Sequence, residues 1–78
     1  MKPRFAVPVR IAIGNVLYDV ASARQAIDVL VNKWPSQRGP KYREARKACV
    51  AALEGKRSTI MARSAFLDAA REAGILVG

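Results

Sequence analysis

A two-residue turn near the N-terminus constrains the fold of this chain more than any other feature of its sequence. Gly14 and Asn15 separate two segments that are rich in β-branched and aromatic residues. Glycine supplies the positive φ that a type II′ turn requires at its first central position, and such turns join the strands of β-hairpins. The sequence therefore predicts a β-hairpin over residues 9–20.

The predicted hairpin has one register that satisfies both of its faces. On one face this register forms three apolar cross-strand pairs, namely Val9 with Val20, Ile11 with Tyr18 and Ile13 with Val16. On the other face Arg10 lies opposite Asp19, a favourable pair of opposite charges. A slip of one residue would destroy both patterns, so we expect the strands to pair in this register.

Three amphipathic segments follow the hairpin and are predicted to be helices, at about residues 22–34, 40–54 and 59–73. Each has a recognisable start. Ser22 and Gln25 have the form of a capping box, Pro40 suits the first position of a helix, and Ser58 or Thr59 caps the third segment.

The first helical segment carries apolar residues at helical spacing, which predicts a buried stripe made of Ala23, Ala26, Ile27, Leu30, Val31 and Trp34. We interpret Trp34 as a core residue, and the alternative is an exposed stacking platform. Residues 75–77 could add a short third strand to the hairpin. The predicted fold class is α+β, with the order β-β-α-α-α.

The length of the chain and its single cysteine limit its class. Its 78 residues predict one small domain that covers residues 1–78. Cys49 alone cannot form an internal disulfide, which suits a reducing compartment. No uncharged run approaches the roughly 20 apolar residues that a membrane span needs. We therefore expect a cytoplasmic protein.

A longer pattern resembles a known family. It runs through three segments, Ala26…Leu30…Trp34-Pro35, then Tyr42-x-x-Ala45-x-x-x-Cys49-x-x-Ala52-Leu53-x-Gly55, and Ala62-Arg63-x-x-Phe66-x-x-Ala69-Ala70-x-x-Ala73-Gly74-Ile75. The Trp-Pro pair, the cysteine and the Ala-Arg-x-x-Phe piece are the most specific parts. The pattern is similar to the short bacterial group catalogued as domain-of-unknown-function family 982, over about residues 8–77. The resemblance implies a small α+β domain and assigns no activity and no functional residues.

Several kinds of chemistry lack their usual residues. Histidine is absent, which removes the commonest general base and the commonest transition-metal ligand. Cys49 falls on the apolar stripe of the second helix, and a buried thiol is usually inert. The six acidic residues do not cluster, and Asp68 and Glu72 are interpreted as a solvated helix face. The sequence predicts no catalytic residue, no metal site and no cofactor, so we expect a protein that is not an enzyme.

The distribution of charge is the one feature that points to a partner. The net charge is +8, and residues 33–63 contain nine bases and two acids, or +7 of it. A surface with this charge attracts acidic partners over long distances. The bases that gather near the start of the second helix oppose the helix dipole, which is positive at that end.

We therefore predict an anion-binding corner at the start of the second helix, formed by Arg38, Gly39, Lys41, Arg43, Arg46 and Lys47. Gly39 would let a phosphate or carboxylate approach the free N–H groups of the helix start. The alternative is a solvated cationic face with no partner.

The expected function is that of a non-enzymatic interaction module with an acidic partner, either a protein or a nucleic acid. If the partner is nucleic acid, we expect nonspecific contact with the phosphate backbone, because the predicted third helix lacks the Asn or Gln that read adenine. A homodimer is a further alternative, because an isolated two-stranded sheet is only marginally stable.

Overall fold

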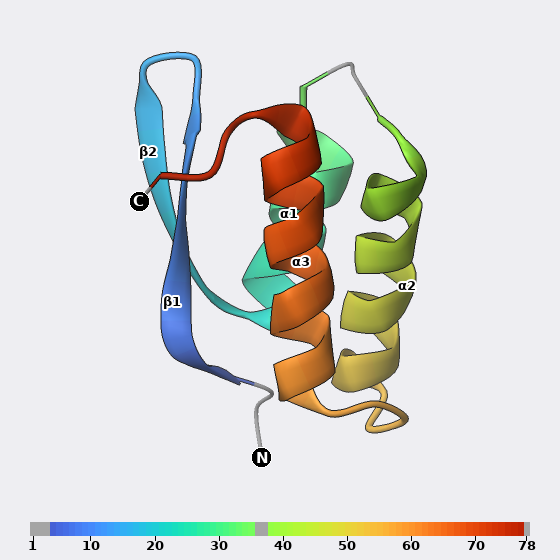
Figure 1. The fold of residues 1–78 in the computed structure, drawn as a ribbon. Helices are drawn as coiled ribbons and strands as arrows, with labels where there is room; N and C mark the ends of the chain where they lie inside the picture. The colour runs from blue at the N-terminus through green and yellow to red at the C-terminus, as the bar shows by residue number, and fades with distance from the viewer. Residues whose placement is uncertain (1–3, 36–37, 78) are drawn as a thin grey trace.

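The chain folds into a β-hairpin followed by three α-helices, as the computed structural model of residues 4–35 and 38–77 shows (Figure 1). The elements are β1 (Arg4–Ile13), β2 (Val16–Ser22), α1 (Ala23–Asn32), α2 (Pro40–Leu53) and α3 (Thr59–Ala73). This order confirms the predicted α+β class and places the helix boundaries within two residues of the predicted ones.

The hairpin adopts the predicted register. All three apolar pairs form, and Arg10 lies opposite Asp19, with 2.8 Å between Arg10 Nε and Asp19 Oδ1. Gly14 has a φ of 60°, while no non-glycine residue of the described ranges has a positive φ, as the type II′ turn requires.

Both strands extend beyond the predicted hairpin. β1 begins at Arg4, and its pairing with β2 is irregular between Arg4 and Val9. Pro8 lies in this irregular stretch, and proline cannot donate a hydrogen bond to a sheet. Alternation alone did not predict this part of β1, because the proline interrupts the pattern.

The helices form two layers against the hairpin. Helices α1 and α3 contact the strands, and α2 packs against α1 and α3 on the side away from the hairpin (Figure 1). The largest fully buried side chains come from both strands and all three helices, namely Phe66, Ile11, Leu30, Val9, Val20 and Cys49. The hairpin and α2 therefore lie on opposite sides of a shared core.

The buried face of α1 differs from the predicted stripe. Val29 is buried, whereas Val31 is 43% exposed and Ile27 is only half-buried. Valine occurs on both flanks of this helix, so spacing alone did not decide which flank faces inward. Trp34 lies beyond the end of α1 and is buried against the Phe66 ring at 5.6 Å, which confirms it as a core residue.

The segment after α3 forms less than a strand. Leu76 makes an isolated antiparallel bridge with Ile11, and within residues 4–35 and 38–77 the sheet has two strands. Ala12 N–H donates to Ile75 O at 2.9 Å, and Val77 N–H donates to Arg10 O at 3.0 Å. The segment thus covers the outer edge of β1 where the third strand was expected.

Candidate binding surface on helix α2

Helix α2 begins at a glycine, so its cap residue supplies no side-chain acceptor. Gly39 occupies the cap position and has no side chain to accept a hydrogen bond from the first turn, and Pro40 follows it. Glu72 fills this role from the end of α3, because its Oε2 accepts a hydrogen bond from Lys41 N–H at 3.3 Å. The negative charge of Glu72 also stabilises the positive end of the α2 dipole.

Gly39 leaves room for the Glu72 carboxylate and is not required by its backbone angles. Its φ is −92°, which any residue can adopt. A Cβ atom added at Gly39 would lie only 2.6 Å from Glu72 Oε1. The close approach of an anion that the sequence suggested at Gly39 is therefore made by a carboxylate of the chain itself.

Asp68 and Glu72 lie on an accessible face of α3, Asp68 half-buried and Glu72 exposed, but they have different partners. Asp68 pairs with Arg71 on α3, with 3.6 Å between Oδ1 and Nη1. Glu72 instead reaches across to α2, as described above. Its role could not be read from α3 itself, because its partner Lys41 lies 31 positions earlier in the chain.

Two of the predicted site residues lie against one aromatic ring. The guanidinium carbon of Arg38 lies 4.9 Å from the centre of the Tyr42 ring, and that of Arg46 lies 5.9 Å from it. Tyr42 itself is buried, and its hydroxyl donates to Leu30 O of α1 at 2.7 Å. Cation–π contacts of this kind hold a charged group near an aromatic face, so Tyr42 positions both arginines.

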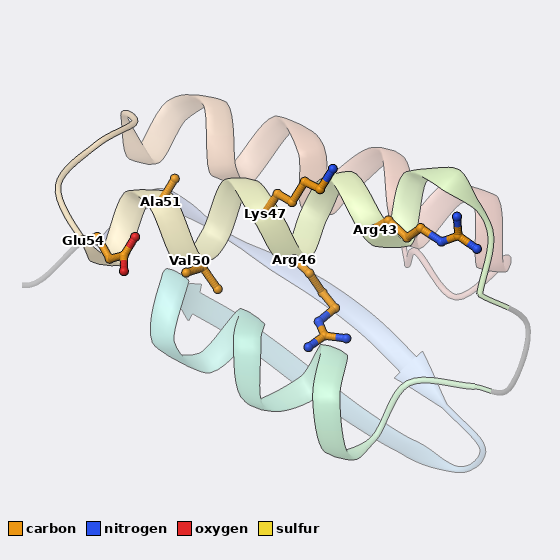
Figure 2. Close-up of a pocket in the computed structure, with 6 residues that line it drawn as sticks. All are labelled: Arg43, Arg46, Lys47, Val50, Ala51 and Glu54. Atoms are coloured by element: carbon orange, nitrogen blue, oxygen red, sulfur yellow. The ribbon is translucent and has the colours of Figure 1, made fainter.

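A shallow hollow of about 500 Å³ lies along the outer face of α2 (Figure 2). The lining residues follow one another at helical spacing, so they share one face, and they are Arg43, Arg46, Lys47, Val50, Ala51 and Glu54. Figure 2 shows Arg46 extending toward α1, while Lys47 extends to the other side of α2. The face is thus basic over its first half, and then apolar up to the carboxylate of Glu54.

The three cations of this hollow have no carboxylate partner among the described residues. The salt bridges that form among the described residues involve other bases, namely Arg10, Lys33, Lys56 and Arg71. Glu44, the one acidic residue between Arg43 and Lys47, forms no salt bridge within residues 4–35 and 38–77. The charge of Arg43, Arg46 and Lys47 is therefore left for solvent or for a partner.

The structure divides the predicted corner into two parts. Arg43, Arg46 and Lys47 line the hollow, and Arg38 joins this group through Tyr42. Lys41 lies about 200° around the helix from Arg43, and its backbone, like Gly39, faces the Glu72 carboxylate.

The sequence reasoning missed the apolar part of the hollow. Val50 is 42% exposed, and its signal in the sequence was a valine that falls outside the apolar stripe of its helix.

The remaining chemistry of the described residues is sparse. Burial raises the pKa of the Cys49 thiol to about 12, and its Sγ lies 3.9 Å from Ala62 O. Within the described ranges, no group of three metal-ligating side chains comes together. No helix of those ranges has the length and apolar character to cross a membrane.

The fold and this surface define a small α+β protein that presents a basic and partly apolar helix face. The chain belongs to the family of proteins of unknown function DUF982, whose family model matches residues 7–77. This match confirms the resemblance seen in the sequence over almost the same range. No curated protein and no solved structure matches the chain.

Proposed function

We propose that this protein is a non-enzymatic binding module that docks an acidic segment of a protein partner on the outer face of α2. One observation carries the proposal. Three cations without carboxylate partners among the described residues, Arg43, Arg46 and Lys47, share a hollow with the exposed side chain of Val50. We also place the protein in the cytoplasm, which suits its single buried cysteine.

The mixture of charge and apolar surface favours a protein partner. The cations would steer an acidic segment toward α2 and orient it. Burial of Val50 and Ala51 under apolar side chains of that segment would add about 25 cal/mol for each Å² removed from water. A helix with acidic residues on one flank and leucines on the other supplies both kinds of contact.

Nonspecific binding of nucleic acid is the second candidate, and it is supported by the same cations together with Arg38. Phosphates would satisfy these charges, but they offer nothing apolar to cover Val50. Such binding would weaken steeply with salt, with a slope of log affinity against log salt of about −0.9 for each duplex phosphate neutralised. A mixed protein interface would show a shallower slope, because burial of apolar surface depends little on salt.

The test compares four labelled probes by fluorescence anisotropy across a salt series. They are an amphipathic Glu/Leu helical peptide, a glutamate peptide of equal charge without leucine, and random duplex and single-stranded oligonucleotides. The proposal expects the Glu/Leu peptide to bind most tightly. It also expects a loss of at least tenfold when Arg43, Arg46 and Lys47 are replaced by Gln, and a smaller loss in Val50→Ser.

A matched variant controls for net charge. Replacement of Arg4, Arg24 and Arg71 by Gln removes the same charge from exposed positions outside α2, and it should leave peptide affinity within about twofold. Equal losses in both triple variants would overturn the proposed surface. Tighter binding of the oligonucleotides, with a steep salt slope, would replace the proposal with the nucleic-acid function.

A further inference from the structure

The outer edge of β2 is open in the described part of the fold. The sheet has two strands, and the segment that follows α3 covers the outer edge of β1 around Arg10 and Ala12. No main-chain group of the described residues bonds to β2 from its outer side. An uncovered edge of this kind presents N–H and C=O groups that can pair with another strand.

The register shows which groups point outward. In an antiparallel pair, alternate residues direct their N–H and C=O groups toward the partner strand and away from it. Arg10 and Ala12 bond outward to the C-terminal segment, so their cross-strand neighbours Asp19 and Leu17 also direct their groups outward. Ala21 does so too, but its N–H already donates to Gln25 Oε1 at 2.8 Å.

The sequence features that prevent strand edges from pairing with other chains are found on β1 and not on β2. β1 contains Arg4, Pro8 and a stretch of irregular pairing, all of which discourage further pairing. β2 has no lysine, arginine or proline, and its single charge, Asp19, is paired with Arg10 across the hairpin. Leu17 is 62% exposed at this unprotected edge.

We propose that a second copy of this chain pairs with β2 in antiparallel orientation, about a twofold axis that passes beside Tyr18. In this register, Leu17 of each copy lies opposite Asp19 of the other, and their outward groups form about four main-chain hydrogen bonds. Val16 of each copy lies opposite Val20 of the other. The two hairpins then form one four-stranded sheet.

Charge and register favour this partner and this axis. The hairpin carries only Arg4, Arg10 and Asp19, so it is the part of a +8 chain where a second copy meets little repulsion. The basic face of α2 lies on the other side of the molecule (Figure 1). An axis beside Asp19 would set two aspartates opposite each other, and one beside Leu17 would pair Asp19 with the turn residue Asn15.

Sedimentation of the whole chain between about 1 µM and 1 mM tests this inference. Pairing of two short strand edges should bury less than about 1,200 Å², the lower end of standard-size interfaces, so we expect a weak dimer with a dissociation constant of about 10–1000 µM. Leu17→Lys adds a charge to the edge, and Leu17→Pro removes an outward N–H that the hairpin itself does not use. Each should raise the dissociation constant at least tenfold while circular dichroism shows an intact fold.

Ile60→Lys is the matched control, because Ile60 is 77% exposed on α3 and the substitution also replaces an exposed aliphatic side chain with lysine, away from the edge of β2. It should dimerise like the parent chain. A parent chain that stays monomeric at 1 mM would overturn the inference. So would a dimer that survives both substitutions at Leu17.

Cysteine cross-linking tests the register. Tyr18→Cys would bring two cysteines opposite each other, at the close Cα separation of a non-hydrogen-bonded pair, about 4.5 Å, which a disulfide can span. Leu17→Cys would leave its two cysteines diagonally apart. Rapid oxidation to a covalent dimer in Tyr18→Cys and not in Leu17→Cys is expected, and the reverse result would contradict the proposed axis.

Discussion

The starts of α1 and α3 differ from the start of α2 in where their caps come from. Ser22 Oγ accepts a hydrogen bond from Gln25 N–H at 3.2 Å, and Ser58 Oγ accepts one from Met61 N–H at the same distance. Both caps lie within a few residues of the N–H groups they satisfy. α2 begins at Gly39 and takes its acceptor from Glu72, at the far end of the next helix.

This difference shows that the free N–H groups of a helix start can be satisfied by a neighbouring residue or by a residue that tertiary structure brings close. Every helix start leaves N–H groups without partners, and a serine cap satisfies one as soon as the turn forms. The cap of α2 forms only when α3 packs beside it. α2 in turn supports α1, because the Tyr42 hydroxyl bonds Leu30 O, one of the last carbonyls of α1, which have no partner within their own helix.

The largest expected change in stability concerns Cys49, which lies where α2 packs against α3. Burial raises its pKa from 9.0 to about 12, so the thiol ionises more readily in the unfolded chain than in the folded one. Its contribution to stability is fully present below pH 9 and is lost as the pH rises toward 12. The free energy of unfolding should fall by as much as about 1.4 kcal/mol per pH unit in this window.

Urea unfolding at pH 8, 9, 10 and 11 would measure this slope. Cys49→Ala is the control, because it removes the thiol and keeps every other ionisable group of the chain. The difference between the two slopes belongs to the thiol. Parallel slopes in both proteins would mean that α2 does not exclude water from Cys49.

Replacement of Tyr42 by Phe tests the long-range link between α2 and α1. It removes one hydroxyl and leaves Leu30 O buried without its donor, which should cost about 1–3 kcal/mol in free energy of unfolding. The ring remains, so Arg38 and Arg46 keep their aromatic partner and binding of an acidic peptide should change little. A loss of affinity without a loss of stability would show that the hydroxyl serves the surface and not the core.

The parts of the fold that could be predicted from sequence are those fixed by neighbours along the chain. The Gly14 turn, the register around Arg10 and Asp19, and the serine cap of α1 each depend on a few adjacent residues. Periodicity could not choose between Val29 and Val31, because that choice depends on how α1 packs against the rest of the fold.

Of the candidate site, only the positions of the charged residues could be predicted from the sequence. The basic residues of α2 are visible in the sequence, but their division into two parts is not. Glu72 is exposed, as interpreted, but its contact with Lys41 N–H was missed because the two residues lie 31 positions apart. Val50 becomes part of the surface only when the orientation of α2 is known.

The serine caps should each contribute about 1 kcal/mol to the free energy of unfolding. Ser58→Ala removes the acceptor of Met61 N–H, and Ser22→Ala removes that of Gln25 N–H. Because both caps are local, the two losses should add, so the double variant should lose about 2 kcal/mol in chemical unfolding. A clear departure from additivity would show that the starts of α1 and α3 are coupled, and the contrast with α2 would weaken.

The cap of α2 should behave differently. Substitutions at its two positions should each lower stability less than the loss of a serine cap, and their effects should not add. Glu72→Ala removes an exposed acceptor and should cost about 0.5–1 kcal/mol. Gly39→Ala should cost a similar amount, because the new Cβ would displace the Glu72 carboxylate. In the Glu72→Ala background, Gly39→Ala should cost almost nothing, because the displaced group is already gone and the backbone at Gly39 has an ordinary φ of −92°.

A double-mutant cycle therefore separates the two kinds of helix start. A coupling energy of about 0.5 kcal/mol or more between positions 39 and 72 would establish that α2 takes its cap from α3. The same Glu72→Ala variant also bears on the proposed surface, since it uncovers N–H groups beside Lys41 but leaves the hollow around Arg46 unchanged. Affinity for the Glu/Leu peptide should stay within about twofold if the partner docks on the hollow, whereas a larger gain would place the partner at the start of the helix.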